Sequence, residues 1–415
     1  MNKKILVVVE SIDIEDSSGT KGRVALIKNL FDAGYNLRVY HYTLKDIQIE
    51  GVPCFRIKEN RNSLLFYLSR IERNLRRKTG IKLNPIIEKY FGFSFTLLND
   101  RNSIINSLRQ INDFNPDLVL TLSKGGSFRP HHAILKMDYL HSKWMAYIHD
   151  PYPMHLYPAP YRWYEPGYNI KEKFVKEMFE KAKYLAFPSK LLKEWMGGFF
   201  QTVMEKSVII PHQISGGQRK NIEIPNYFDK TKFTILHAGH LLKGRDPQGI
   251  INAFNEFLGD IPEAKNDARL IFLGGRNYYT NELNNFSREN PQIYVSEDYV
   301  PYTKVSVMQD HASVNIILET KAEISPFLPG KFPHCIMANK PILLLGPYRS
   351  ESRRLLGDDY EYWSEIDDVE SIKNKIIDLY KNWKATKSFE ISRPDLLYYM
   401  KGKSLHQTLF SIFER

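Results

Sequence analysis

The fold class follows from residues 4–43, KILVVVESIDIEDSSGTKGRVALIKNLFDAGYNLRVYHYT. The segment opens with a short, β-branched and almost wholly apolar run, which is typical of strands buried on both faces. After a polar loop, apolar side chains recur at helical spacing between residues 24 and 31, and Gly34 follows where helix C-termini favour glycine. Residues 37–43 are apolar and aromatic again. Strand, helix and strand at these lengths predict a right-handed parallel βαβ unit.

The same alternation runs through the first half of the chain and then repeats. Further buried strands are predicted by the apolar runs 117–123, 143–150, 184–189 and 207–212. A polar, glycine-rich stretch, residues 214–232, predicts an interdomain linker. The second series has apolar runs at 234–239, 270–275, 314–319 and 341–346, and a helix over 246–258 that opens with aspartate and proline.

Two such series predict an α/β protein of two Rossmann-like, doubly wound domains that face each other across a cleft. We expect an N-terminal domain over residues 1–211 and a C-terminal domain over residues 212–394. A last helix, about 395–415, is expected to return to the N-terminal domain. In open α/β sheets ligands bind at the carboxyl ends of the strands, so the candidate site residues are those that follow predicted strands.

Composition fits this plan. The chain has 415 residues, which suggests two domains, and 43% hydrophobic and 25% charged residues, as in ordinary globular proteins. Two distant cysteines, Cys54 and Cys335, make no disulfide framework and fit a reducing compartment. The first apolar run is short and ends at Glu10, so we interpret it as a strand and not a signal peptide. No run approaches the ~20 apolar residues of a membrane span. We expect a cytoplasmic protein, either free or peripheral on the inner face of the cell membrane.

The formal net charge of +11 favours a polyanionic partner, such as nucleic acid, an anionic membrane or a phosphorylated ligand. The chain has no zinc-finger spacing, ribonucleoprotein motif or repeat, so no nucleic-acid partner is expected.

Two motifs of the first half could carry chemistry. Gly19, Thr20 and Lys21 lie between a predicted strand and helix, where free amides suit phosphate or a sugar hydroxyl, or where a plain flexible loop could lie. His149 and Asp150 end a predicted strand. The imidazole there could hydrogen-bond a sugar hydroxyl or a leaving phosphate, or the two side chains could close a turn.

Two motifs of the second half predict an anion site. Lys243 and Arg245 stand between a strand and a helix N-terminus, where fixed cations and helix amides could neutralise a pyrophosphate. Gly330 and Lys331 belong to a Pro-Gly-Lys run that is predicted to open a helix ending at Asn339.

The second half resembles a known family in the segments GHLLKGRDP, LIFLGG, EDYVPYTKVSVMQDHASVNIIL and FLPGKFPHCIMANKPILLLG. It is similar to the family-four retaining glycosyltransferases (group 1), which have the GT-B fold. The resemblance is most specific between residues 231 and 346. In the first half it rests on the βαβ plan, the loop at Gly19 and the pair His149 and Asp150.

The resemblance implies that the domain over residues 1–211 binds the acceptor and that the domain over residues 212–394 binds the nucleotide sugar. It also implies roles for single residues. Lys243, Arg245 and the Gly330-Lys331 helix start would bind the donor diphosphate, and His149, with Asp150, would lie near the transferred sugar. The nucleobase contact would fall at Tyr299, Val300 and Pro301.

The sequence departs from the family at the paired glutamates, whose places are taken by Pro326 and His334. His334, Glu319 and Glu323 are therefore the candidates for the grip on the ribose and the donor sugar.

No metal or other cofactor is expected beyond the nucleotide-sugar co-substrate. The chain has no Asp-x-Asp motif to hold a divalent ion on the diphosphate. His131 and His132 have no cysteine or carboxylate neighbours in sequence, so we interpret them as structural.

A basic amphipathic segment remains at residues 61–78. Leu64, Leu68, Ile71 and Leu75 form one helical stripe, and arginines crowd the other side. Such a helix could lie on an anionic membrane, or it could pack its stripe on the domain core.

The predicted function is transfer of sugar from a nucleotide-sugar donor to a glycan or lipid-linked acceptor, retaining and metal-independent. The resemblance implies bacterial surface polysaccharide biosynthesis, such as capsule or lipopolysaccharide. Two alternatives are a nucleotide-sugar epimerase on the same fold and a degenerate protein that binds nucleotide sugar or anionic lipid without catalysis.

Overall fold

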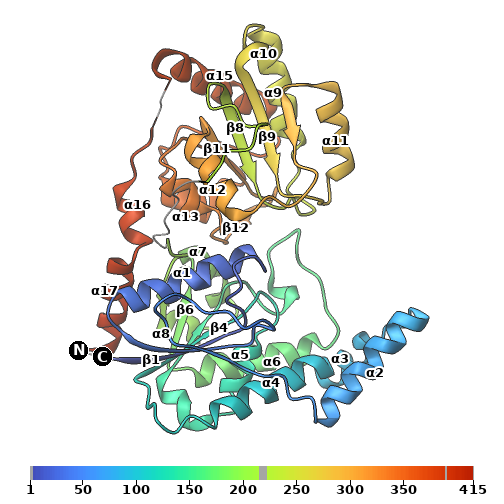
Figure 1. Ribbon diagram of the computed structural model, residues 1–415, viewed down its shortest axis with the longest axis vertical. Coiled ribbons are helices and arrows are strands. Elements are labelled where there is room, and N and C mark those ends of the chain that lie inside the picture. The colour runs from blue at the N-terminus through green and yellow to red at the C-terminus, as the bar shows by residue number, and fades with distance from the viewer. Residues whose placement is uncertain (1–2, 215–221, 388–389, 415) are drawn as a thin grey trace. The chain divides into compact units, whose positions relative to one another are not determined.

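The computed structural model describes residues 3–214, 222–387 and 390–414 (Figure 1). The chain divides into two compact units, Met1–Ser215 with Lys401–Arg415, and Gly216–Met400. The predicted boundaries lie four to six residues away from these divisions, at 211/212 and 394/395.

The first unit is built on a seven-stranded parallel sheet in the order β3-β2-β1-β4-β5-β6-β7. Its strands are β1 (Lys4–Val9), β2 (Asn36–His41), β3 (Cys54–Arg56), β4 (Leu118–Leu122), β5 (Trp144–Tyr147), β6 (Tyr184–Phe187) and β7 (Ser207–Ile209). This is the doubly wound order, in which the chain reverses direction across the sheet between β1 and β4.

Alternation along β1 shows why the sheet is buried on both faces. Ile5, Val7 and Val9 join a core with α1 (Ser18–Asp32) and α17 (Gly402–Phe413), whereas Leu6 and Val8 join the opposite core. That opposite core includes side chains of α4 (Phe95–Leu108), α5 (Arg129–Ile134), α6 (Tyr168–Lys181) and α7 (Lys190–Gly197). Because successive side chains of a strand point to opposite faces, one unbroken apolar run supplies both cores.

The second unit repeats the plan with a six-stranded parallel sheet in the order β10-β9-β8-β11-β13-β15. Its strands are β8 (Phe233–Ala238), β9 (Ala268–Leu273), β10 (Ile293–Val295), β11 (Val314–Leu318), β13 (Ile342–Leu345) and β15 (Trp363–Ser364). The helices α9 (Gln248–Asp260) and α15 (Val369–Thr386) supply one core, and α12 (Tyr302–His311) contributes to the other. The reversal here falls between β8 and β11.

Helix ends follow local chemistry. The side chain of Ser17 caps α1 by accepting a hydrogen bond from the Thr20 amide, and Gly34 leaves the helix with φ +85°. The predicted C-terminal helix is two helices in the structure, α16 (Pro394–Tyr399) and α17. Leu405, Leu409 and Ile412 of α17 are buried with α1 in the first unit, so the helix returns as predicted.

Part of the predicted linker is packed structure. Residues 215–221 lie outside the described ranges, but Phe228 is buried in the second unit beside Leu236 and Met308. The second half of that stretch therefore belongs to a core, because its aromatic residues offer surface worth burying.

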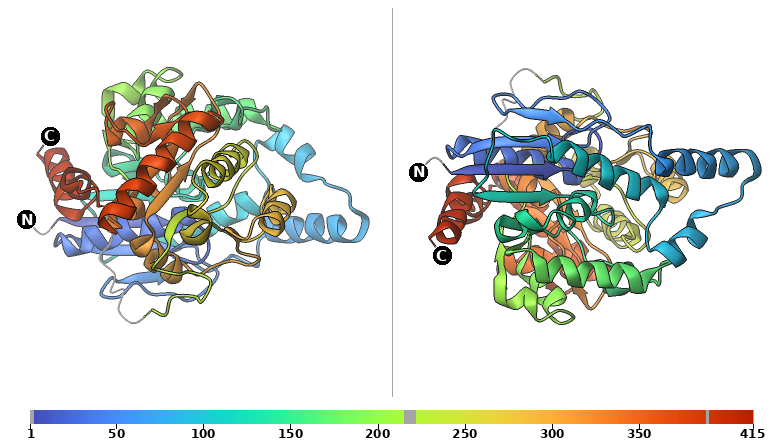
Figure 2. Two further views of the ribbon diagram at one scale, coloured as in Figure 1. Left: turned by 90° about the horizontal axis from the view of Figure 1, so that it is seen from above. Right: turned by 90° about the horizontal axis from the view of Figure 1, so that it is seen from below.

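Two helices stand apart from the body of the first unit. The helices α2 (Leu64–Thr79) and α3 (Asn84–Phe91) extend away from the sheet in every view (Figures 1 and 2). In the described parts of the chain, no helix combines the length and the apolarity needed to cross a membrane.

Candidate functional site

Polar and charged side chains of the second unit gather at the reversal point of its sheet, where doubly wound sheets bind ligands. His237 lies near the carboxyl end of β8, and Glu319 directly follows β11. The loop before α13 (Phe332–Met337) adds Lys331, and the turn before α9 adds Arg245. These four residues form the reversal-point cluster.

Lys331 and His237 are in direct contact. The Lys331 Nζ lies 2.8 Å from His237 Nε2, and His237 Nδ1 has no hydrogen-bond partner among the described residues. Burial lowers the pKa of Lys331 to about 7, and the charge of Arg245 acts in the same direction. Burial, with the charges of Lys331 and Arg245, also holds the pKa of His237 well below its usual value. His237 is therefore a neutral acceptor that orients the lysine.

Arg245 and Glu319 complete the cluster. The Nε of Arg245 is buried, and no group in the described residues accepts its hydrogen bond. Burial raises the pKa of Glu319 to about 7, while hydrogen bonds from Ser352 and Ser325 and the charge of Arg245 oppose the rise. A cluster with two half-buried basic side chains, one of which has a buried donor without a partner in the described residues, is suited to hold an anion, whose oxygens would accept the missing hydrogen bond.

Two glycines allow the strand ends to close around the cluster. Gly239 has φ +132°, and a Cβ there would lie 3.4 Å from Lys331 Nζ. Gly274, after β9, approaches so closely that its Cβ would lie 2.5 Å from the Gly239 carbonyl oxygen. The sequence contained both glycines, but spacing alone did not show that they meet.

The other predicted residues of this unit fall outside the direct contacts of the cluster. Lys243 is exposed in the turn closed by the Arg245 amide and the Leu242 carbonyl. Glu323 is also exposed, whereas Glu319 is 3% exposed. His334 Nδ1 lies 2.9 Å from the Tyr302 hydroxyl.

The helix start at Gly330 was predicted too early. The helix α13 begins at Phe332 and spans six residues, with Gly330 and Lys331 in the loop before it. The helix was predicted to end at Asn339, whereas α13 ends at Met337 and Asn339 follows it with φ +56°. The lysine reaches the cluster by its side chain, so it does not need to be part of the helix.

The predicted nucleobase residues lie at the neighbouring strand ends. Tyr299 is 54% exposed, and its amide nitrogen would be 3.1 Å from a Cβ on Gly275. Val300 packs against the core that contains Leu236, and Pro301 immediately precedes α12.

The first unit has its own polar group at the carboxyl ends of β1, β4 and β5. His149 is half-buried between the rings of Tyr147 and His212, with centroids at 4.4 and 6.1 Å. Its Nε2 has no partner in the described residues. Burial, together with the charge of Arg23, holds the pKa of His149 well below its usual value. Asp150 lies so near Gly125 that a Cβ there would be 2.5 Å from its Oδ2.

Arg23 is a site residue that the sequence analysis missed. It is 2% exposed, donates to the Ser123 carbonyl oxygen at 3.0 Å and to Thr20 Oγ1 at 2.6 Å, and keeps a buried Nε without a partner in the described chain. Burial lowers its pKa to about 10, against the charges of Glu10, Asp16 and Asp150. The available signal was an arginine on the apolar side of a predicted helix, four residues before Ile27.

The predicted loop at Gly19 is not a loop. Gly19, Thr20 and Lys21 form the first turn of α1, and the Thr20 amide is already satisfied by Ser17. Thr20 is fully buried and orients Arg23. In the structure the Thr20 amide is used by the Ser17 cap, and the Thr20 hydroxyl supports Arg23.

A buried ion-pair network lies beside this group. Arg129 pairs with Glu10 and with Asp100, each at 2.6 Å, and the Tyr42 hydroxyl donates to Asp100 at 2.7 Å. The four residues are far apart in sequence, so spacing could not connect them. Each charge has its partner, which indicates a structural role.

The adjacent histidines are buried. His131 Nε2 lies 3.1 Å from the Tyr147 carbonyl oxygen, and His132 stacks on Phe174 with ring centroids 3.6 Å apart. Within the described ranges, no group of three or more His, Cys, Asp or Glu side chains is placed to hold a metal ion.

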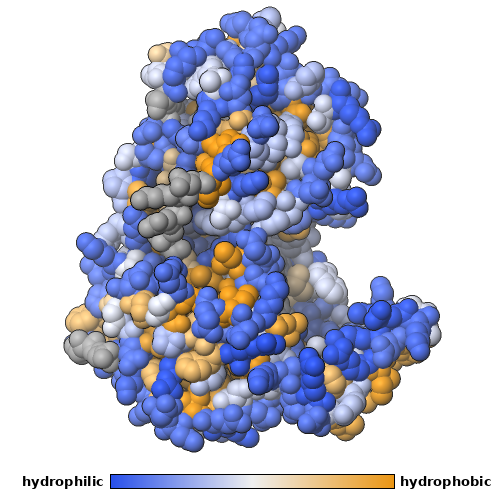
Figure 3. Space-filling model, viewed as in Figure 1, coloured by the Kyte–Doolittle hydropathy of each residue, from blue (hydrophilic) through white to orange (hydrophobic). Residues whose placement is uncertain are grey.

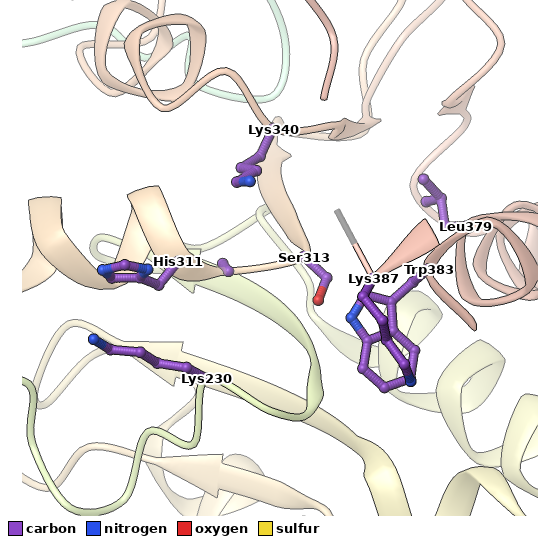
Figure 4. A pocket seen from close by; sticks show the side chains of 8 residues that line it. Lys230, His311, Ser313, Lys340, Leu379, Trp383 and Lys387 are labelled. Carbon is purple, nitrogen blue, oxygen red and sulfur yellow. The ribbon is translucent and has the colours of Figure 1, made fainter. Parts of the chain in front are cut away.

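A small cationic cavity lies at the opposite end of the second sheet (Figure 4). It is lined by Lys230, His311, Lys340 and Lys387, with Trp383 as its aromatic wall. Its volume of about 40 Å³ is far below the roughly 300–1,000 Å³ of small-molecule pockets, so it is too small for a nucleotide.

Comparisons with known proteins show the fold. No protein-family model and no curated protein matches the sequence. Among solved structures, the trehalose-6-phosphate synthase OtsA matches with a TM-score of 0.62 and 11% identity, over 100% of this chain and 99% of its own. TarM matches with a TM-score of 0.62 and 10% identity, over 100% and 99%. A structure described as trehalose-6-phosphate from E. coli bound with UDP-2-fluoro glucose gives 0.58 and 10%, over 99% and 95%. The chain therefore has the GT-B fold, as its resemblance to family-four glycosyltransferases implied.

Proposed function

We propose that this protein is a glycosyltransferase that moves a sugar from a nucleotide-sugar donor to a glycan or lipid-linked acceptor. The observation that carries the proposal is the pair of half-buried basic side chains, Lys331 and Arg245, at the reversal point of the second sheet, with the Arg245 Nε buried and without a partner in the described residues. When a nucleotide sugar reacts, negative charge develops on the departing diphosphate. Preorganised cations in a site shielded from water stabilise such charge far better than cations in solvent do.

The other candidate residues of the second unit would contact the remaining parts of the donor. Glu319 and His334 would hydrogen-bond the sugar and the ribose, and Tyr299, Val300 and Pro301 would contact the base. Lys243, which is exposed, would meet the outer side of the diphosphate. The E. coli neighbour described as bound with UDP-2-fluoro glucose makes a uridine donor the first to test.

The acceptor would bind the first unit at Arg23, His149 and Asp150. A neutral imidazole with a free ring nitrogen can exchange a hydrogen bond with a sugar hydroxyl, and Asp150 can accept one. Arg23 adds a cation suited to a phosphate group on the acceptor. We further propose retention of the anomeric configuration and no metal requirement, because fixed cations would take the place of a divalent ion on the diphosphate.

The setting we propose is assembly of a bacterial surface polysaccharide, such as capsule or lipopolysaccharide, on the cytoplasmic face of the cell membrane. The support is the resemblance of the second half to enzymes of that class. Lipid-linked acceptors of this kind are presented at a membrane.

The test is thermal unfolding against a panel of nucleoside diphosphates and nucleotide sugars. A ligand that binds only the folded state raises the melting temperature by mass action. We expect a shift with one nucleotide that is lost in Lys331→Met and kept in Lys340→Met, a matched lysine at the other end of the sheet. No shift with any nucleotide in folded protein would reject the proposal.

Product analysis with the stabilising nucleotide sugar distinguishes the three candidate functions. Transfer to an added acceptor supports the glycosyltransferase. Conversion to an epimeric sugar without acceptor would identify an epimerase. Binding with neither product would identify a degenerate binding protein.

A further inference from the structure

The α2–α3 arm, residues 64–91, exposes more apolar surface than any function described so far requires. Of the 22 large apolar side chains that are exposed in the described residues, seven lie in this arm. They are Leu64, Tyr67, Ile71, Ile81, Ile86, Tyr90 and Phe91. Figure 3 shows apolar surface gathered along one side of the projecting arm and hydrophilic surface on its other side.

The apolar stripe of α2 faces solvent because another side of the helix is the packed one. Its two buried residues are Ser69 and Glu72, and the helix contacts α4. On the stripe, Leu64 is 73% and Ile71 61% exposed, whereas Leu68 and Leu75 are half-buried. Of the two sequence-based interpretations, packing of this stripe on the core is therefore wrong. Helix α3 extends the exposed surface, since none of its eight residues is buried.

The charge of the arm is one-sided. It holds seven lysines and arginines against two glutamates. Glu72 is buried, and Glu88 is paired with Lys171 at 2.8 Å, so neither offers a free negative charge at the surface. The cations are Arg70, Arg73, Arg76, Arg77, Lys78, Lys82 and Lys89. Long basic side chains beside exposed leucine and tyrosine are typical of helices that lie in a bilayer interface.

We propose that the α2–α3 arm docks on an anionic lipid bilayer. Its apolar side chains enter the boundary between headgroups and acyl chains, and its arginines and lysines contact the lipid phosphates. The other occupant of an apolar face, a second copy of this chain, fits poorly, because it would bring seven cations against seven cations. An anionic membrane offers acyl chains to the apolar side chains of the arm and phosphates to its basic side chains.

The inference rests on the proposed function at one point: docking would bring the protein to the membrane where a lipid-linked acceptor is presented. Docking itself requires only the arm. The donor site lies in the other unit, so nucleotide binding and vesicle binding can be measured separately on the same full-length protein.

The experiment is sedimentation of the full-length protein with phosphatidylcholine vesicles that contain about one-third phosphatidylglycerol. We expect binding that weakens at high salt and on pure phosphatidylcholine. The double variant Leu64→Ser/Ile71→Ser should bind at least about tenfold more weakly, since each side chain loses apolar burial. Its matched control is Leu44→Ser, because Leu44 is 74% exposed elsewhere in the same unit. The control should bind as wild type does.

The cations are tested in the same way. Arg76→Glu/Arg77→Glu should abolish binding to the anionic vesicles, whereas Lys401→Glu/Lys403→Glu, an equal charge change on exposed residues of the same unit, should have little effect. Equal binding by all variants, or no binding by folded wild-type protein, would overturn the proposal. An oligomer that dissociates in Leu64→Ser/Ile71→Ser, without vesicle binding, would also overturn it and assign the face to a second copy. Loss of vesicle binding with the nucleotide shift intact would leave the proposed function standing.

Discussion

At neutral pH, Lys331 lies at its own titration point, because burial lowers its pKa to about 7. A diphosphate that binds beside it stabilises the ammonium form and raises this pKa again. We therefore predict proton uptake when the nucleotide binds between about pH 7 and 9. Calorimetric titration in buffers of different ionisation enthalpy measures this uptake. It should vanish in Lys331→Met, together with a loss of roughly 10- to 100-fold in affinity, the usual cost of a charge-assisted hydrogen bond. Uptake that persists in Lys331→Met would assign the proton to another group.

Burial also shifts the pKa of Glu319 into this range, but upward, because burial disfavours the charged form of both groups. Burial raises the pKa of its carboxyl group from 4.5 to about 7, so the folded state holds a proton that the unfolded chain releases. The resulting stability is complete below about pH 4.5 and is lost as the pH rises through 7.

We therefore predict that Glu319→Gln, which cannot titrate, gains stability over wild type between pH 4.5 and 7 and keeps a constant advantage above that. The gain should reach roughly 3 kcal/mol at most, from a shift of about two to three pKa units. Thermal unfolding at pH 5, 6, 7 and 8 measures it. Glu323→Gln, at an exposed position, is the matched control for the loss of a carboxylate. A stability difference for Glu319→Gln that does not change with pH would contradict the buried, protonated carboxyl.

At the scale of elements, the ends of β8 and β9 meet through Gly274 and Gly239. An alanine at position 274 would place its Cβ 2.5 Å from a backbone oxygen, which cannot move as a side chain can. We predict that Gly274→Ala costs about 1–3 kcal/mol and weakens nucleotide binding, because both loops of the cluster shift.

The control for this change is Gly259→Ala in α9, where a Cβ meets nothing within 4 Å. That variant should be neutral or gain up to about 1 kcal/mol from helix propensity. Urea unfolding compares the two. Equal stability would show that the strand ends are looser than their spacing indicates.

Elements that rest on local pattern could be predicted, and those that rest on distant contacts could not. Adjacent residues were enough to predict the apolar strands Lys4–Val9 and Phe233–Ala238. They were also enough to predict Gly34 at the C-terminal end of α1. The two-residue strand β15 forms by pairing with the neighbouring strand β13, so its own sequence does not predict it. The stripe of α2 shows the reverse case. Its period predicted a helix, but which side packs was decided by α4.

The candidate site divides along the same line. Lys331 and Arg245 could be predicted as candidates because each stands close before a helix in a recognisable motif. His237, 94 residues from Lys331, could not be paired with it, because a histidine at a strand end has many partners open to it. Arg23 was missed because its buried surroundings come from β4 and from its own helix.

At the scale of the whole molecule, the proposed function assigns the acceptor to the first unit and the donor to the second, so transfer would need both units and donor binding only one. Arg23 belongs to the first unit and Lys331 to the second. We predict that Arg23→Met abolishes transfer to the acceptor and leaves the nucleotide-induced rise in melting temperature unchanged, whereas Lys331→Met removes both. Circular dichroism must first show that Arg23→Met is folded, because the guanidinium also holds Thr20 and the Ser123 carbonyl. If folded Arg23→Met also lost the nucleotide shift, the donor would depend on the first unit, and the division of labour proposed between the units would be wrong.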